Sequence, residues 1–160
     1  MKRNAFTLVE LIFVIVIIGV LAALAVPQFR QLQENAQLTN IVKYYTDILT
    51  SSKSAYLNEV ELNNVAMADV NLTQLYDFRG NGWVISNAND TATYTVSIGG
   101  ANQTFVVGYN NAGSITMTTT ISGAVAATRA RLAEKLTVKT GMIFTGANPD
   151  VNATVLPLTE

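Results

Sequence analysis

The sequence predicts an α+β protein in which one long N-terminal helix packs against a small antiparallel sheet. Two patterns support this prediction. Apolar residues run almost without interruption from Phe6 to Val26 and then continue at helical spacing as far as Tyr56. Further along, segments in which Thr alternates with apolar residues are separated by Gly/Asn turns, which is typical of half-buried strands. We therefore expect a long bent helix on a four-stranded antiparallel sheet, with an additional late helix.

The composition excludes several classes of function. Hydrophobic residues make up 49% of the 160 residues and charged residues only 13%, against a usual charged share of about 25%. This balance indicates a membrane segment, or a polar domain joined to a very apolar stretch. The net charge of −1 disfavours a protein that coats DNA. The chain has no Cys and no His, so thiol and imidazole catalysis are excluded, and we expect no enzyme activity, cofactor or metal site.

The segment 6–27 is long enough to cross a membrane once. As a helix, its roughly 21 apolar residues would span about 31 Å, and the hydrocarbon core of a bilayer is about 30 Å thick. Lys2 and Arg3 precede the segment, so the positive-inside rule places the N-terminus in the cytoplasm and the rest of the chain outside.

The segment 28–58 continues the helix in amphipathic form. Pro27 need not end the helix, because a helix can pass a proline with a kink. One helix from about Phe6 to Asn58 is therefore expected, and residues 59–160 must form a head that covers its apolar stripe. The stripe is expected to comprise Phe29, Leu32, Ala36, Ile41, Val42, Tyr45, Ile48, Leu49 and Tyr56.

The head, 59–160, is rich in Thr, Asn, Ser and Gly and is expected to be a meander with one wet face. Helix-forming residues follow Ser122-Gly123, and the tail from Thr140 is expected to be irregular. The expected strands lie around 83–86, 93–98, 105–109 and 115–121, and the expected late helix runs from Ala124 to about Lys139.

Glu10 is the most informative single residue. A lone carboxylate within an apolar segment costs several kcal/mol unless it is paired, roughly 2.5 or more by insertion scales. It can lie near the membrane boundary and reach headgroups and water, or it can pair with a cation. No Lys or Arg lies nearby on the helix, but cleavage of the chain just upstream would create a positively charged α-amino group.

The stretch from Lys2 to Leu11 resembles the class III leader and cleavage site of type IV pilins and the related pseudopilins. The resemblance implies that a prepilin peptidase removes the leader, 1–5, by cutting between Ala5 and Phe6, and then N-methylates Phe6. Ala5 stands where the family usually has Gly. Gly19 and Pro27 match the helix glycine and the proline of the family.

By this resemblance, the chain is a structural subunit of a type IV pilus-like extracellular filament. The subunit would be held in the inner membrane before assembly, and the inner-membrane assembly machinery would then extract it into a homopolymer formed through the N-terminal helix. Glu10 would pair with the Phe6 amine of a neighbouring copy. The stretch between Gly19 and Pro27, where helix propensity is low, is expected to loosen on assembly.

Other functions stay open at this point. One alternative is a type II secretion or competence pseudopilin in a periplasmic pseudopilus. By the resemblance, many pilins carry a C-terminal disulfide, so the absence of Cys from this chain is compatible with a pseudopilin. Ala23-Leu24-Ala25 also fits a signal-peptidase site, and cleavage there would release a soluble secreted domain. An uncleaved single-span anchor is a further alternative.

A basic stripe on the late helix is a candidate contact for DNA or another anionic surface. The simpler interpretation is a solvated face, or one that pairs with the acidic residues Glu59, Glu61 and Asp69 of a neighbour. DNA is disfavoured, because removal of Lys2 and Arg3 takes two positive charges from a chain of net charge −1 and leaves −3. The residues of this candidate contact are Arg129, Arg131, Lys135 and Lys139.

Overall fold

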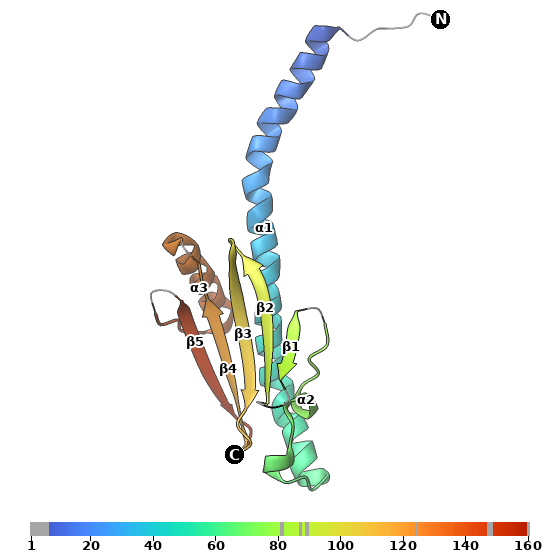
Figure 1. The fold of residues 1–160 in the computed structure, drawn as a ribbon, viewed down its shortest axis with the longest axis vertical. Helices are drawn as coiled ribbons and strands as arrows, with labels where there is room; N and C mark the ends of the chain where they lie inside the picture. Colours follow the sequence, from blue (N-terminus) through green and yellow to red (C-terminus); the bar gives the residue numbers. More distant parts are fainter. Residues whose placement is uncertain are drawn as a thin grey trace, which may run out of the picture. The chain divides into compact units, whose positions relative to one another are not determined.

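The computed structural model describes residues 7–80, 82–86, 88, 90–123, 125–146 and 149–159. The chain forms two compact units, Met1–Ala36 and Gln37–Glu160. The elements in chain order are helix α1 (Leu8–Leu57), the π-helix η1 (Asn58–Leu62), the 3₁₀ turn η2 (Met67–Asp69), the short helix α2 (Leu72–Leu75), strands β1 (Trp83–Ser86), β2 (Thr91–Ile98), β3 (Ala101–Tyr109) and β4 (Ser114–Ile121), helix α3 (Ala126–Thr140) and strand β5 (Asp150–Pro157) (Figure 1).

Helix α1 is continuous through Pro27, as the sequence predicts. Pro27 has no N–H, so the carbonyl of Ala23 lacks its usual helical partner at this point. The helix then widens into η1, where the N–H of Asn63 donates to the carbonyl of Asn58 at 3.0 Å. The predicted end at Asn58 is correct to within a residue of the end of α1.

The sheet is a pure antiparallel meander of five strands in the order β1-β2-β3-β4-β5. The four predicted strands are present, but the prediction of an irregular tail is wrong, because β5 pairs with all eight residues of β4. The reason is the mixed polarity of β5. Asn152, rather than an apolar residue, occupies its buried position opposite Thr119, so hydrophobic alternation does not reveal the strand.

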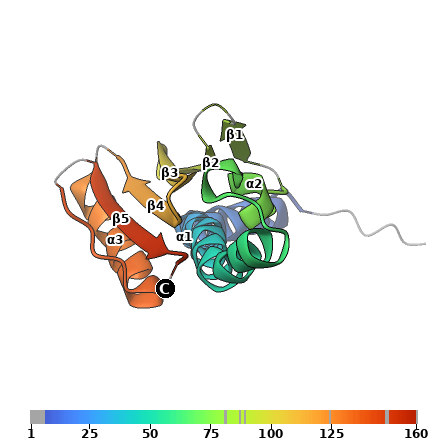
Figure 2. The same ribbon diagram turned by 90° about the horizontal axis from the view of Figure 1, so that it is seen from below.

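The core lies between one face of the sheet and two helices, α1 and α3, which cover that same face (Figure 2). The opposite face carries Thr and Ser and stays partly exposed. The expectation that the covered stripe of α1 includes Phe29 and Leu32 is wrong, since they are 62% and 65% exposed and the core begins only at Leu38. The buried residues of α1 are Leu38, Ile41, Tyr45, Ile48, Ser52 and Tyr56.

Trp83 at the start of β1 is the centre of an aromatic cluster that ties this short strand to α1. Its ring lies 5.0 Å from that of Tyr44 on α1 and 4.8 Å from that of Phe78, both edge-on. The rings of Tyr94 and Phe105 lie 5.5 and 6.1 Å away. Edge-to-face pairs at such distances add roughly 0.5–1.5 kcal/mol each beyond their burial. A four-residue edge strand is held in place in this way.

The free edge of β5 is short. Thr145 exchanges two backbone hydrogen bonds with Val151, at 2.9 and 3.2 Å, and so covers the start of the edge. Pro157 at the other end has no N–H. Outward and inward N–H groups alternate along an antiparallel strand, so only Ala153 and Val155 present outward N–H groups along β5.

Candidate assembly site

The first part of α1 has an apolar surface on all sides. Large apolar side chains are exposed from Leu8, at 74%, through to Leu32, with Ile12 the least exposed at 46%. This helix is long and apolar enough to cross a membrane. Soluble proteins rarely leave so large an apolar surface in water. The segment therefore requires cover, either by lipid or by other helices.

The helix begins with a capping box formed by Thr7 and Glu10. The N–H and the hydroxyl of Thr7 both donate to Oε2 of Glu10, each at 3.1 Å, and the N–H of Glu10 donates to Oγ1 of Thr7 at 3.3 Å. Thr-x-x-Glu before an apolar run is the sequence signal of this motif, and reasoning that treated Glu10 as a lone carboxylate missed it. An ionised carboxylate has about four acceptor positions, so the cap leaves capacity for a cationic partner.

The other predicted assembly residues can be placed only in part. Ala5 and Phe6 lie outside the described residues. Gly19 and Pro27 both lie within α1. A Cβ added to Gly19 would have nothing within 4 Å, so this glycine is not required by packing inside the chain. Its effect is a weaker helix, by about 1 kcal/mol relative to Ala.

The candidate basic stripe separates into two parts. Arg131, Lys135 and Lys139 recur every four residues and share one face of α3. Arg129 does not belong with them. It is only 9% exposed, and its Nη1 donates to the carbonyl of Gly123. The structure thus corrects the grouping of Arg129 with the surface cations.

Two tyrosines of the head have raised pKa values, and neither is ionised at neutral pH. Burial raises the pKa of the Tyr109 hydroxyl, which donates to the carbonyl of Met67 at 2.8 Å. Burial also raises the pKa of Tyr76, and the nearby Asp47 adds to this effect. Both phenols therefore stay protonated at neutral pH. Among the described residues, acidic side chains do not gather into a group of three or more that could hold a metal ion.

Fold and site together define a class of protein: a subunit with an apolar N-terminal helix that must be kept dry and a polar, β-rich head. Membrane-held subunits that later polymerise through such helices meet both requirements.

Comparison with known proteins specifies this class further. A family model for the prokaryotic N-terminal methylation motif matches residues 1–26. Two fimbrial proteins of Pseudomonas aeruginosa are each 31% identical over 101 residues, which is 60% of this chain and 66%, just under two thirds, of each relative. The type IV narrow pilus major component PilA5 of Thermus thermophilus is 31% identical over 118 residues, 65% of this chain and 95% of that protein. No solved structure matches the chain significantly.

The chain therefore belongs to the type IV pilin family, whose members are structural subunits of pili. This assignment confirms the family to which the residues from Lys2 to Leu11 point. The long apolar helix and the methylation motif also suit anchoring in a membrane before assembly.

Proposed function

We propose that this chain is a structural, non-enzymatic subunit of a type IV pilus-like extracellular filament, held in the inner membrane before assembly and polymerised through α1. The observation that carries the proposal is the exposed apolar surface from Leu8 to Leu32, which directly follows a short basic leader. Lipid covers this surface before assembly, and the helices of other copies cover it afterwards. The relatives are named as fimbrial or pilus components, which favours a pilus subunit over a secretion or competence pseudopilin.

Processing and assembly follow from the N-terminal residues. A prepilin peptidase cuts between Ala5 and Phe6 on the cytoplasmic side, and the new amine of Phe6 is methylated but keeps its charge. In the filament this amine meets the carboxylate of Glu10 in a neighbouring copy. Thr7 holds that carboxylate through two hydrogen bonds at 3.1 Å, which support a fixed position for the acceptor. The pair sets the axial register of one helix against the next.

The segment between Gly19 and Pro27 is the part of α1 that we expect to loosen when the filament forms. Glycine and proline lower helix stability by about 1 and about 3 kcal/mol relative to Ala. Pro27 also removes one hydrogen bond of α1. A filament structure with unbroken helical hydrogen bonds throughout this segment would contradict the expectation.

DNA is not the proposed partner. The basic stripe is reduced to three surface cations once Arg129 is removed from it, and the mature chain is acidic. Nucleic-acid affinity depends on the number of phosphates neutralised, and three cations give a shallow salt dependence and weak binding.

The test is the intact mass and N-terminal sequence of the protein in a sheared cell-surface fraction. The expected result is an abundant chain that lacks residues 1–5 and begins with N-methylated Phe6. Ala5→Gly is the matched variant, and we expect it to be processed at least as fast. A chain that begins at Val26 and is found in the medium would overturn the proposal, as would an uncleaved chain confined to the membrane.

A further inference from the structure

Two surfaces of the globular unit carry opposite net charge, and each has one strongly exposed apolar side chain. The acidic end is defined as Glu59, Glu61 and Leu62 on η1. The basic stripe is Arg131, Lys135 and Lys139 on α3, with Val138 between the last two. Leu62 and Val138 are 78% and 80% exposed and are the most exposed large apolar side chains in the part of the chain that the structure describes. Leu62 is thus flanked by two carboxylates, and Val138 by three cations, with the acidic Glu134 on the same face of α3.

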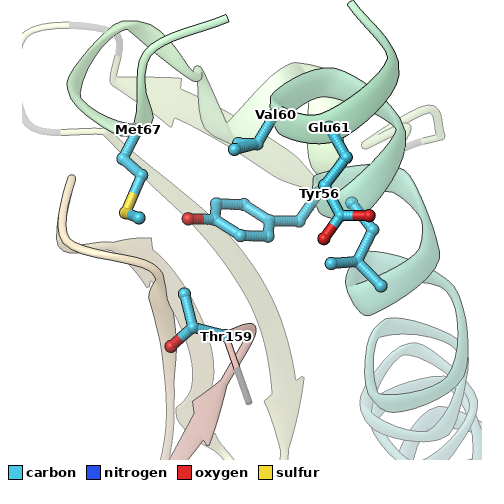
Figure 3. Close-up of a pocket in the computed structure, with 6 residues that line it drawn as sticks. Tyr56, Val60, Glu61, Met67 and Thr159 are labelled. Atoms are coloured by element: carbon cyan, nitrogen blue, oxygen red, sulfur yellow. The ribbon is translucent and has the colours of Figure 1, made fainter. Parts of the chain in front are cut away.

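A hollow of about 400 Å³ adjoins the acidic end (Figure 3). The ring of Tyr56 crosses it, with Val60 on one side and Met67 beyond the hydroxyl, and the carboxylate of Glu61 lies on the side away from the hydroxyl. Tyr56 is 1% exposed, and its hydroxyl is fully buried. A hollow with both apolar and polar walls and the Glu61 carboxylate among its lining residues matches a lysine side chain, whose apolar stem carries a cationic tip.

The two surfaces lie toward opposite ends of the globular unit. In Figure 1, α3 lies beside the upper part of the sheet, and η1 lies below its lower end. One copy therefore cannot satisfy its own pair of surfaces. A contact between η1 of one copy and α3 of the next is heterologous, so it leaves one unused surface at each end and can be repeated without closing.

We propose that the acidic end of one copy docks on the basic stripe of the next copy, with Leu62 against Val138 and a lysine of the stripe in the hollow beside Glu61. This inference rests on the proposed function, since it describes how heads meet in the filament. Exposed charge pairs add little affinity and are screened by salt. Their role is to fix which heads meet and in what register, while the buried helices hold the polymer together.

Charge exchange in the full-length chain tests the contact. One variant is Glu59→Lys with Glu61→Lys, and the other is Lys135→Glu with Lys139→Glu. Each alone brings like charges together, which costs more than the loss of a pair, and should lower the yield of sheared filaments by about tenfold or more. Their combination restores opposite charges and should bring the yield to within about threefold of wild type. Arg79→Glu, on a residue whose side chain is 90% exposed outside both surfaces, is the control and should leave the yield unchanged.

A disulfide test does not depend on the folding of the charge variants. The chain has no Cys, so Leu62→Cys with Val138→Cys introduces the only two thiols. If the contact forms, the Cβ atoms come within reach of a bond, about 3.5–4.5 Å apart, and oxidised filaments should give a ladder of covalent multimers. Leu62→Cys alone, and Leu62→Cys with Val84→Cys on β1, should give none.

The outcomes separate this inference from the proposed function. The contact alone would be overturned if filaments form normally but give no ladder of disulfide-linked multimers. It would also be overturned if the combined charge variant yields no more filaments than either charge variant by itself. Covalent dimers of the single variant Leu62→Cys would indicate a symmetric interface and would also overturn the contact. The same conclusion would follow if the charge variants of α3 lose DNA capture but form filaments normally. If the wild-type chain forms no filaments at all, the proposed function fails and this inference fails with it.

Discussion

Glu10 caps α1, and in the proposed filament it also pairs with the amine of a neighbouring copy; two substitutions distinguish these roles. Glu10→Gln removes the charge but keeps an acceptor that can still form the capping box with Thr7. Thr7→Val removes the hydroxyl, and with it two of the three hydrogen bonds of the cap, but leaves the carboxylate charged. If Glu10 only caps α1, the second substitution should be the more harmful. If Glu10 pairs with a neighbour, the first should be.

The expected magnitudes differ enough to be distinguished. Loss of an N-terminal cap costs about 0.5–2 kcal/mol of helix stability. The packing of the apolar helix against lipid or neighbouring helices is unaffected by this loss. Leaving a buried amine unpaired costs about 3–5 kcal/mol, which at about 1.4 kcal/mol per tenfold corresponds to a factor of roughly 100 to 5,000 in the association constant between subunits. Glu10→Gln should therefore nearly abolish filaments, and Thr7→Val should lower them by about 30-fold at most.

The assay is the amount of subunit in the sheared fraction relative to the processed pool left in the membrane. The membrane pool of Glu10→Gln should match or exceed that of wild type, because the substitution blocks assembly and not insertion. Normal filaments from Glu10→Gln would refute the pairing argument and leave Glu10 as a cap alone. A shrunken membrane pool would show instead that the residue acts before assembly.

Other predictions concern the head and α1. Leu136→Ala should lower the free energy of unfolding by about 2–5 kcal/mol in urea titrations followed by Trp83 fluorescence, because Leu136 is fully buried. Gly113→Ala should cost about 1–3 kcal/mol in the same assay, since φ is +82° and the new Cβ would lie 2.8 Å from Cγ2 of Thr159. The pKa of Tyr109 is raised in the folded state, so the folded protein favours the protonated phenol. The stabilisation that Tyr109 adds to the free energy of unfolding is therefore complete below pH about 10 and is lost as the pH rises through the folded pKa. Tyr109→Phe should flatten the alkaline part of a stability–pH profile. Pro27→Ala should slow amide exchange around residue 27, because it restores a donor to α1.

Much of the fold follows from periodicity. The apolar pattern specified one continuous helix through Pro27, and alternation with Gly/Asn turns specified β1 to β4. Strand β5 could not be found in this way, because its buried positions include Asn152 and its outward Val155 is 62% exposed. Its place is determined by register with β4, which is information from elsewhere in the chain.

Two features of the site could have been predicted from residue spacing: the burial of Arg129 and the Thr7–Glu10 cap. Arg129, Leu132 and Leu136 stand at helical positions i, i+3 and i+7 and form the buried stripe of α3. The same spacing shows that Arg129 faces away from Arg131. The Thr7–Glu10 cap was likewise present as Thr-x-x-Glu. By contrast, no local pattern encodes where along α1 the buried stripe begins, and so the exposure of Phe29 and Leu32 could not be predicted.

The short free edge of β5 has a consequence for a crowded polymer. In a filament the heads stand side by side at a very high local concentration, where an open strand edge would recruit its neighbour and fuse two sheets. Thr145 pairs with one end of that edge, and Pro157 at the other end has no N–H to donate. A merged sheet would therefore gain few backbone hydrogen bonds. Contacts between heads are then left to side chains, and each head keeps its own five-stranded sheet in the polymer.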